Sequence, residues 1–190
     1  MQRGCWVAEF RLETERLVLR SWRDEDRTPF AAICADAQVM ATLGPVVDRT
    51  QSDALIDRVK AMDAAHGHTF WALERRCDAQ LIGWCGVVRG DMPPIEGSAE
   101  IGWRLASAAW GHGFATEAAR ATLDWLFATL ADSSALAITN SGNLRSRAVM
   151  ERLGMAYCPA LDFAHPKLDE TDPLRPHVTY VLPRANWLQR

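Results

Sequence analysis

The sequence predicts a mixed α/β (α+β) domain with a mostly antiparallel central sheet and one β-α-β unit late in the chain. The first observation behind this prediction is a set of short segments in which apolar and polar residues alternate, the period of a half-buried strand. The second is a segment, residues 119–130, whose apolar residues fall on one helical face. The third is the stretch Trp110–Ala118, called here the glycine loop, which joins a strand to that helix.

The first strand is expected at Leu17–Leu19, followed by an acidic run at residues 24–26. Negative charge suits the positive end of a helix dipole, so the acidic run predicts the start of a helix. Three side chains of that helix are expected to point inward: Phe30, Ile33 and Cys34.

A second helix is predicted after the break at Gly44-Pro45. Thr50, with Asp53 three residues on, resembles a capping box at its start. Three apolar residues mark its buried face: Leu55, Val59 and Met62. Gly67 suits its end, because glycine readily adopts the left-handed conformation that closes a helix.

Three strands are expected before the glycine loop: 69–74, 80–88 and 98–105. The first two flank a turn at residues 76–79 and form a hairpin. The segment Asp91–Pro94 is a loop, because proline cannot donate a hydrogen bond to a strand ladder.

Beyond the glycine loop and its helix, Asn143 can cap a further helix that stops at Gly154. Three extended segments are expected: 135–139, 155–157 and 177–182. Before the last of them lies a long excursion, residues 159–176. A loop of this length in a domain is more often functional than idle.

Composition and charge limit the classes of function. The 190 residues suit one domain, 1–190, and the net charge of −3 provides no positive field for nucleic acid or an anionic membrane. No apolar run is long enough to span a bilayer, and no signal-peptide h-region stands in residues 1–20. Five scattered cysteines without a C-x-x-C pair indicate reduced thiols, so we expect a cytoplasmic protein, either a monomer or a homodimer. His66 and His68 have no third ligand nearby, so no metal site is expected.

The glycine loop has the chemistry of an anion site. Gly111 and Gly113 let the backbone turn tightly and approach a ligand, since neither carries a Cβ. The helix start behind them offers unpaired N–H groups and the positive end of a dipole. Together these features predict a cradle for a phosphate. The alternative is that the two glycines only make a turn.

Two nucleotide sites match this loop poorly. A P-loop requires Gly-Lys-Ser or Gly-Lys-Thr, which the sequence lacks. A Rossmann site requires a small residue where Thr116 stands and an acid at the end of the next strand, where Asn140 stands. A nucleotide-dependent oxidoreductase is therefore the least favoured class.

Several ordered motifs resemble the GNAT N-acetyltransferase superfamily. The glycine loop resembles its acyl-CoA pyrophosphate loop, whose pattern is Gln/Arg-x-x-Gly-x-Gly/Ala. Four other segments resemble, in order, motifs of one branch: 12–20, 99–103, 143–155 and 180–187. That branch is the Rim-type (RimJ- and RimL-like) one, which includes enzymes that acetylate the N-termini of ribosomal proteins. The resemblance implies the GNAT acyl-CoA N-acyltransferase fold, with a splayed central sheet and helices on both faces.

The resemblance also implies where acetyl-CoA binds. Backbone groups of Trp103 and Leu105 would bond the pantetheine arm like an added strand. Backbone N–H groups of the loop would hold the pyrophosphate: Gly111, His112, Gly113, Phe114, Ala115 and Thr116. The Asn143 side chain would bind the pantetheine or the acetyl end, with Ser146 near the sulfur.

The chain departs from the family pattern at two positions. Trp110 stands where Gln or Arg is usual, a change that binding through backbone groups should tolerate. Met150 stands where many members place a tyrosine that protonates the leaving thiolate. The Rim-type resemblance suggests Ser146 as the replacement acid, with Tyr157 second. A thiol pKa of about 8.5 means that the thiolate leaves without much help.

Direct acetyl transfer also needs a base for the amine. Glu100, on the strand beside the cofactor, is the candidate, with Glu96 second; the alternative is that Glu100 faces solvent or pairs with an arginine. Deprotonating an α-amine of pKa near 8 costs about 1.4 kcal/mol at pH 7, against over about 4 kcal/mol for a lysine. Glu117 is expected to favour the helix start, and His112 to face solvent.

Other charged residues are candidates for binding. Arg145 and Arg147 could meet the CoA 3′-phosphate, or else belong to a solvated helix face. The acidic segments 91–96 and 162–172 could line an acceptor site for a cationic amine.

The sequence thus predicts an acetyl-CoA-dependent N-acetyltransferase that acts on a primary amine. The acceptor is a protein N-terminal α-amine or a small molecule, such as a polyamine, an amino acid or an antibiotic. The alternative, kept open by Met150, is a non-catalytic acyl-CoA-binding sensor or interaction module on the same fold. No metal, nucleic-acid or membrane partner is expected.

Overall fold

A computed structural model describes residues 9–189, which fold around one open sheet of nine strands. The strand order is β1-β2-β3-β4-β5-β6-β9-β7, and β8 pairs with β9. In this part of the chain β5 and β6 are the parallel neighbours, and the other pairs are antiparallel. The strands are β1 Arg11–Glu13, β2 Leu17–Arg20, β3 Phe70–Arg75, β4 Gln80–Arg89, β5 Ala99–Leu105, β6 Ser134–Asn140, β7 Ala156–Tyr157, β8 Phe163–Ala164 and β9 Pro176–Pro183.

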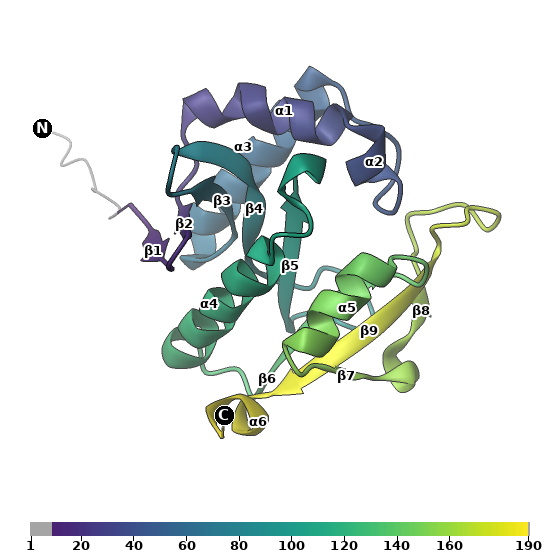
Figure 1. The fold of residues 1–190 in the computed structure, drawn as a ribbon. Coiled ribbons are helices and arrows are strands. Elements are labelled where there is room, and N and C mark those ends of the chain that lie inside the picture. The colour runs from purple at the N-terminus through teal and green to yellow at the C-terminus, as the bar shows by residue number, and fades with distance from the viewer. Residues whose placement is uncertain (1–8, 190) are drawn as a thin grey trace, which may run out of the picture.

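Helices cover both faces of this sheet, which confirms the predicted mixed α/β architecture. The helices are α1 Arg27–Ala35, α2 Ala37–Met40, α3 Arg49–His66, α4 Phe114–Thr129, α5 Leu144–Arg152 and α6 Arg184–Leu188. Figure 1 shows α1 and α3 (blue) lying together, apart from α4 and α5 (green), with β9 running beside α5. Short 3₁₀ turns lie at 24–26, 107–109 and 159–161.

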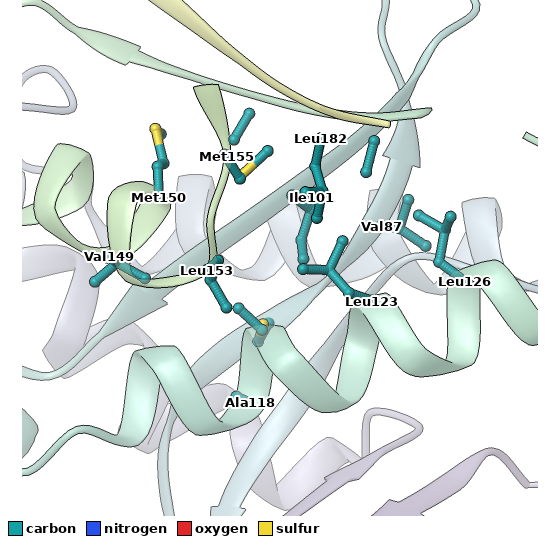
Figure 2. Packing of buried hydrophobic residues seen from close by; sticks show 14 of the residues in the cluster. Val87, Ile101, Ala118, Leu123, Leu126, Val149, Met150, Leu153, Met155 and Leu182 are labelled. Carbon is teal, nitrogen blue, oxygen red and sulfur yellow. The ribbon is translucent and has the colours of Figure 1, made fainter. Parts of the chain in front are cut away.

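The hydrophobic core has two layers, one on each face of the sheet. On the α4 face, Leu123 and Leu126 are fully buried and point toward Ile101 and Val87 of the central strands (Figure 2). Each such side chain contributes about 1.5–3 kcal/mol by leaving water. On the α1 and α3 face, the core is built from aromatic and aliphatic side chains that include Phe30, which confirms the inward face predicted for α1.

The start of α3 differs from the prediction. The N-cap is Asp48, whose carboxylate accepts from Gln51 N (2.8 Å), while Gln51 Oε1 accepts from Asp48 N (2.9 Å). The predicted pairing of Thr50 with Asp53 is wrong, because the helix has already begun at Arg49. The end is as predicted, since Gly67 closes the helix with φ 71°.

The β3–β4 hairpin is confirmed, whereas several short elements were not predicted. β1, β8, α2 and α6 have two to five residues each, too few to show a period. The excursion 159–176 is more structured than a plain loop, because it holds a 3₁₀ turn and β8. The final strand and the helix capped by Asn143 match the prediction.

The sheet splays where β5 and β6 meet. Among the described residues, their parallel pairing registers only at Glu100 and Leu136. Beyond Glu100, the edge of β5 that faces β6 has no strand partner, although β4 stays paired with β5 as far as Leu105. Backbone groups that a sheet would normally satisfy are therefore available to a ligand along this edge.

Candidate active site

A large open cleft of about 1280 Å³ lies at the splay and collects residues from distant parts of the chain. One side is formed by α2 and α3, and the other by the glycine loop and α5, with β5 between them. Most of the site residues predicted from the sequence line this cleft.

The glycine loop presents a row of free donors to the cleft. Gly111 (φ 81°) and Gly113 (φ 79°) both adopt the left-handed conformation that favours glycine. In the described part of the chain, no acceptor takes the backbone N–H groups of residues 111–116, whereas Glu117 N bonds Gly113 O at 3.0 Å. Free N–H groups at the start of the long helix α4 form an anion site.

His112 lies within the row 111–116 but does not line the cleft. Its side chain is exposed and stacks on Phe114, with ring centroids 5.6 Å apart. The predicted solvent-facing position of the imidazole is confirmed. Its backbone N–H still belongs to the row of free donors, while its carbonyl accepts from Arg16 Nη1 (3.0 Å).

A clamp behind the loop holds it to the first strands. Glu117 accepts from Arg16 Nε (2.7 Å), Arg16 N (3.0 Å) and Thr14 Oγ1 (2.6 Å). Burial opposes ionisation of Glu117, but these hydrogen bonds and the charge of Arg16 prevail and lower its pKa. The carboxylate thus lies at the start of α4, as predicted, and also positions the loop. The contact with Arg16 was not predicted, because Arg16 lies about a hundred residues away in the sequence.

Trp110, which stands where Gln or Arg is usual, contacts both β5 and α5 through its indole ring. Its Nε1 donates to Leu105 O (3.0 Å), and the guanidinium carbon of Arg145 lies 4.3 Å from its ring centroid. The indole therefore ties the end of β5 to α5 across the cleft. It also uses one lone pair of the carbonyl that was expected to bond the pantetheine arm, leaving the second.

The start of α5 places three nominated residues along the cleft: Asn143, Arg145 and Ser146. Asn143 caps the helix, because its Oδ1 accepts from Ser146 N (3.2 Å), and its Nδ2 donates to Thr139 Oγ1 (3.0 Å). The Ser146 hydroxyl has no partner among the described residues and is available to a ligand. Met150, one turn further along the same helix face, is 1% exposed and supplies no proton.

Glu100 lies on β5 at the point where the strands separate. Burial, with a contribution from the negative charge of Asp91, raises the pKa of its carboxyl to about 7. Within residues 9–189 no arginine or lysine pairs with it. The structure therefore shows neither of the two alternatives, since Glu100 is neither fully exposed to solvent nor paired with an arginine.

Two second-choice candidates lie outside the cleft. Glu96 is exposed and does not contribute to its lining. Tyr157 is exposed too, and its hydroxyl donates to Asp162 on the outer part of the sheet. Arg147 also points elsewhere, because it donates to Tyr180 Oη (3.2 Å) and to Ser141 O (3.1 Å).

The acidic segments do not build the cationic-amine site suggested by the sequence. Asp91 lines the cleft but pairs with Lys167 at 3.0 Å. The long excursion contributes His165 and Lys167 to the lining, whereas Asp162 accepts from Thr179 N (3.1 Å) outside it. Asp91 and Asp162 are thus both engaged by partners elsewhere in the chain, which the sequence pattern of their loops does not show.

Several other features concern what the chain binds. In the described range no cluster of three His, Cys, Asp or Glu side chains could hold a metal, and no helix is long and apolar enough to cross a membrane. Four cysteines of this range are free thiols: Cys34, Cys77, Cys85 and Cys158. Cys5 lies outside the described residues.

Comparison with known proteins identifies the architecture. The family model described as an acetyltransferase (GNAT) domain matches residues 16–156. The uncharacterized protein YkkB of Bacillus subtilis is 32% identical over 153 residues, which cover 79% of this chain and 87% of YkkB. An acetyltransferase of Agrobacterium tumefaciens has a similar crystal structure, with a TM-score of 0.75, 25% identity, and coverage of 96% of this chain and 99% of that one.

A Rim-type enzyme shares the fold at low identity. RimL, a ribosomal L7/L12 alpha-N-protein acetyltransferase solved in complex with coenzyme A, aligns with a TM-score of 0.74 over 92% of this chain and 98% of its own. At 12% identity this likeness concerns the fold alone.

Proposed function

Because the chain belongs to the GNAT acetyltransferase family, we propose that it transfers the acetyl group of acetyl-CoA directly to a primary α-amine, a protein N-terminus in the first instance. Acetyl-CoA-dependent acetyl transfer is the activity of the family. The choice of amine, the catalytic residues and the Rim-type kinship are the parts that we propose.

Acetyl-CoA fits the residues that line the cleft. The free N–H groups of 111–116 suit its pyrophosphate, and the unpaired edge of β5 at Trp103 and Leu105 suits its amide-bearing pantetheine arm. Asn143 keeps one donor and one acceptor position for the same arm, since its other positions are used within the protein. Arg145, which lines the cleft from α5, suits a phosphate. The thioester supplies the activated acetyl group.

The observation that carries the choice of amine is the environment of Glu100. A base with a pKa of about 7 is half ionised at neutral pH and can accept a proton directly or through one water. Taking a proton from an α-amine of pKa near 8 then costs about 1.4 kcal/mol. The same transfer from a lysine of pKa about 10.4 costs over about 4 kcal/mol. Glu100 therefore suits an α-amine.

Ser146 is the proton donor that we propose for the leaving thiolate. Its hydroxyl is free and lines the cleft, and it stands one helical turn before the buried thioether of Met150. The demand on this residue is small, because a thiol of pKa about 8.5 is a fair leaving group.

One observation favours a second candidate function. Met150 is buried in the place where many family members carry a tyrosine hydroxyl, so the cleft could bind an acyl-CoA without turning it over. On that alternative the protein is an acyl-CoA sensor or an interaction module.

A reducing compartment suits this chain. The four cysteines of the described range are unpaired, and Cys34 and Cys85 are buried in the core as small apolar residues. We accordingly propose a cytoplasmic location. We propose a monomer or a homodimer, since the cleft is lined by described residues of one copy of the chain.

An acceptor panel tests the proposal. The protein is incubated with acetyl-CoA and peptides that carry a free α-amine, with the same peptides blocked at the N-terminus but containing a lysine, and with polyamines. We expect thiol release, and a mass gain of one acetyl group, with the free α-amines. Acetylation of lysine or polyamine in preference would contradict the α-amine assignment. Acetyl-CoA binding without thiol release from any amine would establish the sensor instead.

A further inference from the structure

The cleft is positively charged although the protein is not. The chain has a net charge of −3, yet six arginine or lysine side chains line the cleft against two carboxylates, Asp91 and Glu100. Two of these cations are neutralised, Arg89 by Asp132 (2.5 Å) and Lys167 by Asp91 (3.0 Å). Arg145 and Arg152 belong to α5, on the side proposed for acetyl-CoA. This leaves two cations on the opposite side, Arg58 of α3 and Arg104 of β5.

Arg104 has no acidic partner among the described residues. Its Nη1 donates to the Sγ atom of buried Cys34 (3.3 Å), and its Nε is buried without a hydrogen-bond partner. Asp36, two residues beyond Cys34, does not serve it, because Asp36 accepts from Ser107 Oγ (2.5 Å) and Gln38 N (2.8 Å). A partly desolvated guanidinium with an unused donor is costly unless a ligand supplies the missing negative charge.

The surroundings of Arg104 form an aromatic shelf. The Arg104 guanidinium carbon lies 4.9 Å from the centroid of the Trp84 ring, directly across the β4–β5 ladder. The Phe70 ring packs over Gly102, where a Cβ would come within 2.9 Å of it, and its centroid lies 5.3 Å from that of Trp84. The cation–π contact orients the guanidinium, and the terminal N–H donors that Cys34 does not take are left for an anion.

Glu100 and Arg104 share one face of β5. Side chains two and four residues apart on a strand point the same way, so Glu100, Gly102 and Arg104 line a single path along the cleft. Four residues of strand separate the two charged positions by about 13 Å between Cα atoms. A base thus lies at one end of the path, an aromatic shelf in the middle and an unpaired cation at the other end.

We propose that the acceptor carries an anionic group, a carboxylate in the simplest case, which binds Arg104 while its amine lies toward Glu100. The spacing along β5 favours an amine and a carboxylate several bonds apart, as in a short peptide segment with an acidic residue near its α-amine. This inference rests on the proposed acetyl transfer and narrows its acceptor class. It disfavours polyamines, which bring further positive charge to a cationic site.

Matched acceptors test the anionic group. Peptides with a free α-amine and an amidated C-terminus carry glutamate or glutamine at the second, third or fourth position, and kcat/KM is measured with saturating acetyl-CoA. In at least one pair, kcat/KM for the glutamate peptide should exceed that for the glutamine peptide about ten- to a hundred-fold. This is the ratio expected from one charge-assisted hydrogen-bonded pair. Free amino acids and dipeptides with an unblocked C-terminus, each beside its carboxamide, form a second arm that separates a small-molecule acceptor from a protein N-terminus.

Variants of Arg104 locate the preference. Arg104→Met should remove it by raising KM for the glutamate peptide, with kcat and the calorimetric Kd for acetyl-CoA nearly unchanged. Arg104→Lys, which keeps the charge without the planar fork, should retain part of it. Arg49→Met, which removes a cation of α3 outside the cleft, should leave the preference intact.

The outcomes separate this inference from the proposed function. Equal use of acid and amide acceptors, or a preference that persists in Arg104→Met, overturns the anionic acceptor while leaving acetyl transfer in place. Absence of thiol release with every amine, in protein that binds acetyl-CoA, overturns the proposed function and this inference with it. A carboxylate preference found only among free amino acids and dipeptides supports the role of Arg104 and moves the acceptor from a protein to a small molecule.

Discussion

At the scale of single residues, the environment of Glu100 differs from that of two other carboxylates, Glu117 and Asp132. Glu117 and Asp132 accept hydrogen bonds from arginines, which lower their pKa values. Glu100 has burial and the nearby charge of Asp91 instead, and both raise its pKa, to about 7. A perturbed carboxyl in a large cleft is where acid–base chemistry is expected.

The first prediction concerns the pH dependence of turnover. Ionised Glu100 is the active base, so kcat/KM should show a rising limb with an apparent pKa of about 7, in addition to the ionisation of the acceptor amine near pH 8. Glu100→Gln should lower kcat about 10²–10⁴-fold and abolish this limb, keeping only the ionisation of the acceptor amine near pH 8. Stopped-time thiol assays between pH 5.5 and 9.5 measure both effects.

A stability measurement checks the same pKa independently. The folded state holds the Glu100 proton more tightly than the unfolded state, so this group lowers stability as pH rises from about 4.5 to about 7. The melting temperature of Glu100→Gln should therefore exceed that of the parent at pH 8 and equal it at pH 4.5. Glu96→Gln, a matched carboxylate outside the cleft, should change neither stability nor turnover. An unaltered rate profile in Glu100→Gln would rule Glu100 out as the base.

At the scale of elements, the working unit is the glycine loop with the helix behind it. Positive φ angles at Gly111 and Gly113 turn six consecutive N–H groups away from internal acceptors, and the Arg16–Glu117 clamp fixes the loop against β2. The clamp explains why a loop rich in glycine can present a defined set of donors. Rigid presentation matters because an anion site made of backbone groups has no side chains to adjust.

The second prediction concerns this loop. Gly113→Trp should abolish measurable acetyl-CoA binding by calorimetry, because a Cβ at residue 113 already lies 3.6 Å from Arg16 Nη2 and a large side chain would displace the clamp. The matched control is Gly67→Trp, which places the same side chain at a residue of similar φ, 71°, that closes α3 outside the cleft. That control should lose some stability and keep its affinity. Unchanged affinity in folded Gly113→Trp would remove the loop from the site.

At the scale of the whole molecule, a buried ion-pair network joins the first strands to the helical layer. Arg20 and Asp26 are each 3% exposed and form two hydrogen bonds, of 2.7 and 2.8 Å, while Arg20 Nε donates to Glu74 at 2.8 Å. Burial opposes the charge of Arg20, but the hydrogen bonds and charges of Asp26 and Glu74 prevail and raise its pKa. The network connects β2, the 3₁₀ turn before α1, and β3.

The third prediction is that breaking this network is costly. Arg20→Met leaves the buried carboxylate of Asp26 without its cation and Glu74 with only the more distant Arg23, at 4.0 Å, and should lower the free energy of unfolding by about 3–5 kcal/mol. In a chain of this size that corresponds to a melting temperature lower by about 10 °C. Arg49→Met breaks the exposed pair with Asp53 and should cost about 0.5 kcal/mol or less. Melting temperatures are measured by differential scanning calorimetry. An equal decrease in Arg20→Met and Arg49→Met would contradict the larger contribution of the buried network to stability.

The sequence by itself determined the local elements and the family. The period of residues 119–130, the glycines at 111 and 113, and the cap at Asn143 depend on neighbours along the chain, and α4, the loop and α5 form where these features lie. The same local patterns placed the three central strands to within two residues. The short helix α2 and the N-cap of α3, Asp48, were not predicted, because a single turn of chain is too short to show a hydrophobic period.

Only the tertiary structure decided which residues meet and what their charges face. It excluded Tyr157 and Glu96 from the cleft, set the pKa of Glu100 through burial, and brought Arg145 over Trp110. It also left Arg104 beside Trp84 without an acid, which no pattern near residue 104 reveals. The physical reason is that desolvation and charge pairing depend on atoms close in space, and in this sheet those atoms come from strands and helices far apart in the chain.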